Sequence, residues 1–66
     1  MTIHLNGKNH EIAAPARVDT LLAAIGLGDK PVVVELNQTA LFPREYAVTT
    51  LEDGDKVEII TIAAGG

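Results

Sequence analysis

The sequence contains no cysteine and no tryptophan, and only one phenylalanine and one tyrosine. Without cysteine, no disulfide can stabilise the chain, and it has no thiol of its own to act as a nucleophile. Basic residues are also few: five lysines and arginines stand against nine aspartates and glutamates, for a net charge of −4. We therefore expect no binding to nucleic acid or to an anionic membrane surface.

Long apolar runs and low-complexity segments are missing as well. No stretch has the length that a membrane span needs and no signal peptide is recognisable, so we expect a cytoplasmic protein. The hydrophobic fraction is nevertheless 47%, which argues against a disordered chain. With 66 residues the chain has room for one small domain. Its core must consist of valine, isoleucine, leucine and alanine.

The beginning of the sequence predicts a β-hairpin. Residues 2–5 alternate apolar and polar side chains, and Asn6-Gly7 follows, which is the strongest short signal for a two-residue hairpin loop. Such a loop pairs Ile3 with His10. It also places His4 and His10 on opposite faces, where they cannot share a metal ion.

A short helix is expected next. Four apolar residues recur at helical spacing and form one stripe: Val18, Leu21, Leu22 and Ile25. Gly26 suits the residue just after the end of this helix. Arg17 stands where Ser, Thr or Asp would cap the start best.

Three later segments have the composition of strands. Residues 32–36 predict an internal strand, residues 39–42 a short one, and residues 56–62 a strand rich in β-branched side chains. Residues 43–46, with proline first, predict a single helical turn. The last strand is too apolar for an exposed edge, so we place it centrally, beside the first strand. This order predicts an α+β domain, with one main helix on one face of a mixed sheet of four or five strands.

The sequence ends with Ala63-Ala64-Gly65-Gly66, directly after the last strand. These residues have almost no side chain, and glycine lets the backbone approach another molecule closely. We therefore expect a folded domain over residues 1–62 and a flexible tail over residues 63–66 that enters the active site of a partner. The carboxylate of Gly66 is the reactive group that such a tail delivers, and it needs activation. A frayed chain end is the alternative.

Strand alternation predicts which side chains face away from the helix. If Val57, Ile59 and Thr61 face the helix, their neighbours along the strand face the open side of the sheet. The residues expected there, which we call the open-face patch, are Val33, Glu35, Glu58, Ile60 and Ile62. Apolar surface beside a functional tail is typical of a partner interface, and acidic side chains steer toward basic surfaces. Ordinary sheet surface is the alternative.

Several short motifs follow one another in a characteristic order. They are Leu5-Asn6-Gly7, residues 18–22, residues 34–37, Pro43-Arg44, Leu51, Asp53-Gly54-Asp55, residues 57–59 and Gly65-Gly66. Over essentially the whole chain they resemble the ThiS-type sulfur carriers of thiamin thiazole biosynthesis, which belong to the ubiquitin-like β-grasp family. Arg17 departs from the small hydroxyl residue expected at its position, which concerns helix stability and not the tail.

The resemblance implies a β-grasp fold and a sulfur-carrier function. An adenylating, E1-like enzyme would activate the Gly66 carboxylate with ATP. Sulfur from a persulfide donor protein would displace AMP and leave a thiocarboxylate on Gly66, and a thiazole synthase would take up that sulfur. The chain itself would bind no cofactor or metal and would be a co-substrate, because it lacks a phosphate-binding glycine loop and a nucleophile–base pair.

Other functions remain open at this point. The small subunit of molybdopterin synthase shares the fold and tail, but that family tends to be longer and to have proline where this chain has residues 61–63. A carrier that supplies sulfur to another metabolite is a second alternative. A ubiquitin-like modifier joined through Gly66 to lysines is a third, and a non-covalent binding module that needs no free tail is a fourth.

Overall fold

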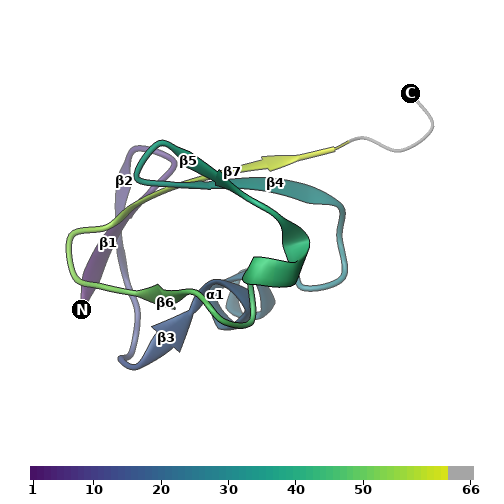
Figure 1. Ribbon diagram of the computed structural model, residues 1–66. Coiled ribbons are helices and arrows are strands. Elements are labelled where there is room, and N and C mark those ends of the chain that lie inside the picture. Colours follow the sequence, from purple (N-terminus) through teal and green to yellow (C-terminus); the bar gives the residue numbers. More distant parts are fainter. Residues whose placement is uncertain (63–66) are drawn as a thin grey trace.

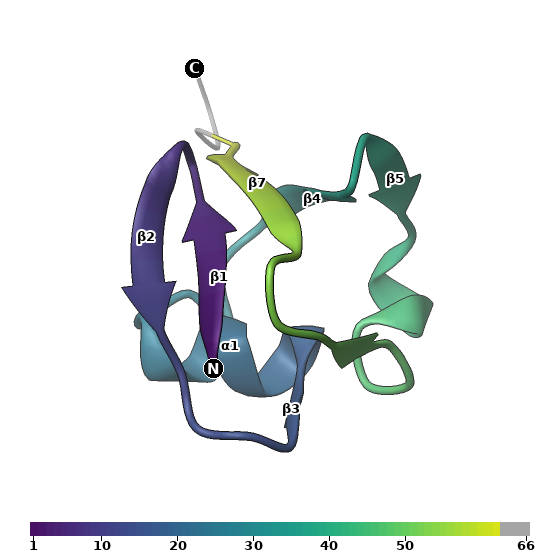
Figure 2. The same cartoon turned by 90° about the vertical axis from the view of Figure 1, so that its left-hand side faces the viewer.

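The computed structural model describes residues 1–62. A five-stranded sheet has the order β2-β1-β7-β4-β5, and helix α1 lies on one of its faces (Figures 1 and 2). The elements are β1 Thr2–Leu5, β2 Lys8–Glu11, β3 Ala16–Arg17, α1 Val18–Ala24, β4 Val32–Leu36, β5 Thr39–Leu41, the 3₁₀ turn η1 Pro43–Glu45, β6 Thr50–Leu51 and β7 Lys56–Thr61. β1 and β7 are parallel, and the other neighbours are antiparallel. The mixed α+β sheet and the central place of the last strand are confirmed.

The first hairpin has the predicted register. Ile3 lies opposite His10 and His4 opposite Asn9, so the two histidines are on opposite faces of the sheet. Asn6 has a φ of 51° and the following glycine a φ of 80°, as a two-residue hairpin turn requires. The local sequence signal therefore determines both the turn and the register of this hairpin.

Helix α1 buries Val18, Leu21 and Leu22 against the sheet. Gly26 has a φ of 82°, and the Leu27 N–H donates to the Leu22 carbonyl at 2.8 Å. This is a Schellman motif, in which a glycine with positive φ lets the chain turn back on the last helical turn. The predicted stripe and the predicted end of the helix are both confirmed.

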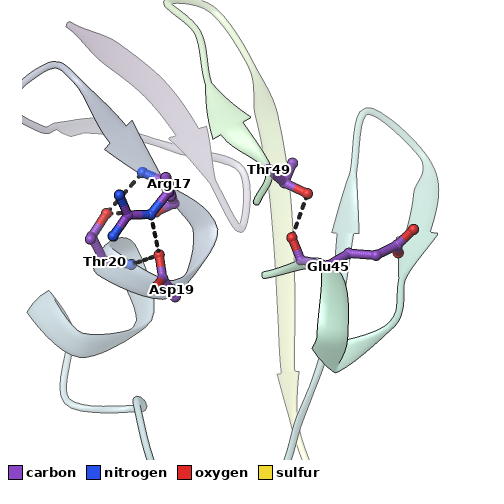
Figure 3. A network of polar contacts seen from close by, with 5 residues as sticks. All are labelled: Arg17, Asp19, Thr20, Glu45 and Thr49. Carbon is purple, nitrogen blue, oxygen red and sulfur yellow. Dashed lines mark hydrogen bonds and ion pairs between the residues drawn. The ribbon is translucent and has the colours of Figure 1, made fainter. Parts of the chain in front are cut away.

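The start of the helix compensates for the missing cap at Arg17 (Figure 3). The Arg17 N–H donates to Thr20 Oγ1 at 2.8 Å, and Arg17 Nε donates to Asp19 Oδ1 at 3.0 Å. Thr20 thus supplies one half of a capping box, while Asp19 places a negative charge near the helix N-terminus. The same figure shows the hydroxyl of Thr49 donating to the Glu45 carbonyl at 2.6 Å, which ties the chain down after η1.

The core lies between the sheet and the helix. Its buried residues are Ile3, Ala16, Val18, Leu21, Leu22, Val34, Leu51, Val57 and Ile59. Within residues 1–62, every buried side chain is apolar. Val57 and Ile59 face the helix as predicted, whereas Thr61 is exposed because β7 runs on beyond α1 (Figure 1).

One feature of the fold was not predicted. β3 and β6 form a separate two-stranded sheet in which Ala16 pairs with Leu51 and Arg17 pairs with Thr50. Ala16 and Leu51 are both buried. This small sheet connects the entry of the helix to the chain that leads into β7.

Candidate functional site

The candidate site is the far end of β7, from which the chain continues into residues 63–66. A turn at residues 53–55, in which Gly54 has a φ of 85°, leads into this strand. The turn is fastened to β1 on both sides: Gly54 N–H donates to the Thr2 carbonyl at 2.7 Å, and Thr2 N–H donates to Asp53 Oδ1 at 2.8 Å. The turn that leads into β7 is therefore fixed next to the start of the first strand, and β7 itself begins beside His4.

Asn6 holds the middle of β7 with its side chain. Its Oδ1 accepts the Ile59 N–H at 2.7 Å, and its Nδ2 donates to the Ile59 carbonyl at 3.3 Å. Its own N–H donates to the Val57 carbonyl at 2.9 Å. The side-chain amide has the same donor and acceptor as a peptide group. Asn6 thus continues the pairing of β1 with β7 past the last residue of β1.

The far end of β7 is held on the other side by β4. Val32 lies opposite Thr61, and the Ile62 N–H donates to the Pro31 carbonyl at 3.0 Å. Hydrogen bonding therefore reaches the last described residue. The predicted tail residues Ala63, Ala64, Gly65 and Gly66, and with them the predicted sulfur attachment point, lie outside the described residues.

The open face of the sheet carries the residues that alternation predicts. Val33 lies opposite Ile60 across β4 and β7, and their exposed fractions are 39% and 60%. Ile62 is 51% exposed and also lines a surface groove with Pro43 and Tyr46. The register and exposure of Val33 and Ile60 agree with the outward positions predicted for them, and the exposed Ile62 lies two residues further along the chain.

Two carboxylates adjoin these apolar side chains. Glu35 and Glu58 lie directly opposite each other on β4 and β7; Glu58 is exposed and Glu35 half-buried. Within residues 1–62 neither of them has a cation within ion-pair distance, since the ion pair found there joins Arg17 and Asp19. The open-face patch is therefore both apolar and negative.

The structure adds exposed features that sequence reasoning missed. Phe42 is 58% exposed, with the Arg44 guanidinium 4.6 Å from the centre of its ring, and Val48 is 77% exposed. Both lie after β5 and outside the open-face patch. The scarcity of aromatic residues could have drawn attention to Phe42, but nothing in the local pattern marks Val48.

His4 and His10 lie on opposite faces of the first hairpin. Among the described residues, no three His, Cys, Asp or Glu side chains are grouped so that they could hold a metal ion. No helix in residues 1–62 is both long and apolar enough to cross a membrane. Within residues 1–62 the candidate site consists of the far end of β7 and the open-face patch beside it.

The parallel central pair, the single helix across the sheet and the strand order define a ubiquitin-like β-grasp domain. The family model for the ThiS family matches residues 3–66. The chain belongs to the ThiS family.

Solved structures support this assignment. The chain aligns over its full length, and over the full length of the neighbour, with the crystal structure of the thiamine biosynthesis protein ThiS from Geobacter metallireducens, at 35% identity and a TM-score of 0.85. An NMR structure of a thiamine biosynthesis protein from the same organism gives a TM-score of 0.83.

Sequence relatives fall into two groups. The chain is 32% identical to a segment of the thiazole synthase of Magnetococcus marinus and 33% identical to a segment of that of Paramagnetospirillum magneticum. It spans about a fifth of the length of these two proteins. It is also 35% identical to the protein ycf40 of Porphyra purpurea, of which it covers 93%.

Proposed function

We propose that this chain is a sulfur carrier of thiamin biosynthesis that carries sulfur as a thiocarboxylate on Gly66. The observation that carries the proposal is the match to the ThiS family, which runs through the two terminal glycines. The geometry of β7 is a second support, because β4 pairs with this strand as far as Thr61 and Asn6 binds its other edge at Ile59, which fixes the direction in which the chain leaves the sheet. On this proposal the chain is a co-substrate and its partners are the catalysts.

The chemistry would proceed in three steps. A Gly66 carboxylate oxygen attacks the α-phosphorus of ATP, and pyrophosphate leaves. The outer sulfur of a protein persulfide then attacks the acyl carbon of the adenylate, and AMP leaves. A thiol finally cleaves the sulfur–sulfur bond, which releases the thiocarboxylate and leaves a disulfide. The chain contains no cysteine, so both the persulfide and the thiol must come from elsewhere.

The proposed partners follow from these steps. An adenylating enzyme supplies ATP chemistry, a persulfide protein supplies sulfur, and a thiazole synthase accepts it. The segment within two thiazole synthases that resembles this chain supports the last of these partners, because domains joined in one protein commonly act together. No cofactor is bound by the chain itself, and ATP serves the adenylating enzyme in the cytoplasm.

Intact-mass spectrometry tests this function. The chain ending at Gly66 should gain the mass difference between sulfur and oxygen after incubation with ATP, the adenylating enzyme and a persulfide donor. A variant with one residue added after Gly66 is the control, and it should stay unmodified, because its reactive carboxylate is displaced by a residue. Isopeptide adducts on lysines would instead show a protein modifier, and sulfur uptake by the extended variant without trimming would contradict the mechanism.

A further inference from the structure

The two edges of β7 are unequally occupied. On one side β4 accompanies the strand from Val57 to Thr61. On the other side the pairing with β1 ends at Leu5 and Val57, and in Figure 1 the far half of β7 extends away from the first hairpin. The strand therefore changes from an internal strand to an edge strand before it reaches the predicted tail.

Alternation shows which backbone groups lie at this open edge. Ile62 and Lys56 direct backbone groups toward the β4 side, since Ile62 N–H donates to Pro31 and the Lys56 carbonyl accepts the Asn37 N–H at 2.7 Å. Residues 57, 59 and 61 therefore direct theirs toward the β1 side. The carbonyl of Val57 and both backbone groups of Ile59 are taken by Asn6.

Thr61 is the next residue in this series. Its backbone N–H and C=O point to the β1 side, two residues beyond the Asn6 side chain and past the end of β1. The residue is exposed. Within residues 1–62, no strand lies along this edge at Thr61. An unpaired strand edge is a template for pairing with another chain.

We propose that the Thr61 edge of β7 pairs with an extended segment of the protein that receives the tail, so that this partner adds a short strand on the β1 side. The inference rests on the proposed function. Any protein that takes in residues 63–66 must pass within two residues of Thr61, so the edge adjoins the contact that the function requires. Backbone pairing does not depend on side chains, which would let partners of different sequence use the same edge.

A second copy of the chain is the less favoured occupant. Only Thr61 offers a donor and an acceptor at this edge within the described residues, and so short a ladder cannot hold two free domains together. A tail-binding partner adds the contacts made by the tail itself. Pairing at the Thr61 edge then orients the tail relative to the partner and contributes a small part of the binding affinity.

Amide hydrogen exchange in solution tests the pairing directly. In the free protein, Thr61 N–H should exchange much faster than Ile60 and Ile62 N–H, which face β4. Saturation with the adenylating enzyme should slow exchange at Thr61 by about tenfold or more, as a newly formed hydrogen bond does. Thr61 N–H that keeps its fast exchange in a complex that still activates Gly66 would overturn the inference and leave the proposed function standing.

A pair of variants gives a second test. Thr61→Pro removes the N–H that faces the open edge and no bond to β4, and proline is tolerated where a strand N–H faces solvent. We expect its affinity for the adenylating enzyme to fall about 3- to 10-fold, the loss of one hydrogen bond. Thr61→Ala keeps the N–H and should bind as the unmodified chain does.

Two further outcomes separate the alternatives. If Thr61→Pro and Thr61→Ala lowered the affinity for the adenylating enzyme equally, the effect would belong to the side chain. That result would overturn backbone pairing. A different outcome is that Thr61 N–H exchanges slowly without any enzyme and becomes more protected as the protein concentration is raised. That result would identify a second copy as the occupant and overturn the proposal. If Thr61→Pro fails to fold, the exchange measurement on the unmodified chain still decides.

Discussion

Glu35 and Glu58 are two like charges in direct cross-strand register. Like charges directly opposite each other on neighbouring strands are destabilising, and here they share the open face of the sheet. Replacing either carboxylate therefore removes a repulsion. The same two charges give the open-face patch its negative sign, which favours a partner with basic groups at this position.

Glu58→Gln should accordingly stabilise the free domain. We expect the free energy of unfolding to rise by about 0.2–1 kcal/mol at low ionic strength, as measured by urea denaturation. The gain should shrink at high salt because salt screens exposed charges. Asp29→Asn, which removes a charge from an exposed loop residue, is the control and should change stability less. A Glu58→Gln variant that is less stable than the original would contradict the repulsion.

The pairing of the first hairpin with β7 depends on one side chain. Asn6 forms the hairpin turn with positive φ and also binds both backbone groups of Ile59. These two roles can be separated, because glycine adopts positive φ without strain but has no side-chain amide. We call the two hydrogen bonds between the Asn6 side chain and the Ile59 backbone the clamp. The clamp keeps the middle of β7 an internal strand.

Asn6→Gly should keep the turn and lose the clamp. We expect a loss of about 1–3 kcal/mol, because the part-buried N–H and C=O of Ile59 lose their partners. Thermal unfolding and faster exchange of the Ile59 amide proton would measure it. Gln38→Gly is a matched control: Gln38 also has positive φ, at 70°, and this change should leave stability equal or slightly higher. If both variants lost the same amount of stability, the effect would come from placing glycine in a turn and not from losing the side-chain bonds to Ile59.

Sequence patterns predicted the first hairpin and the orientation of β7, because the signals for both are local. Asn6-Gly7 determines its own turn, and the apolar alternation of residues 57–60 fixes which side faces the helix. The clamp by Asn6 was not predictable, because it depends on a strand 53 residues away in the chain. The β3–β6 sheet was missed for a different reason: two residues per strand give no period to detect.

At the scale of the whole molecule, helix α1 covers one face of the sheet, and within residues 1–62 no helix covers the other face (Figure 1). Alternation predicts outward positions for Val33 and Ile60, and their register and exposure agree with this. The role of the open-face patch as a partner interface stays a prediction, because sequence pattern and exposure describe a surface without naming what covers it. The tail residues that carry the predicted chemistry lie outside the described residues.

Ile60→Asp tests the role of the open-face patch. Ile60 is 60% exposed, so the variant should fold, whereas a charge in the middle of an apolar interface should weaken adenylation of Gly66 by about tenfold or more. Circular dichroism and the ATP–pyrophosphate exchange rate measure the two effects. Val48→Asp introduces the same charge at an apolar side chain that is 77% exposed outside the patch, and it should be activated normally. Normal activation of Ile60→Asp would show that the patch is sheet surface only.

The central position of β7 has a mechanical consequence. Hydrogen bonds in a sheet run roughly perpendicular to the strands, so a pull along β7 from beyond Ile62 loads its bonds with β4 in shear, all at once. An edge strand peeled sideways would instead lose its bonds one by one. A partner can therefore pull on the chain beyond Ile62, or release it, without unfolding the domain.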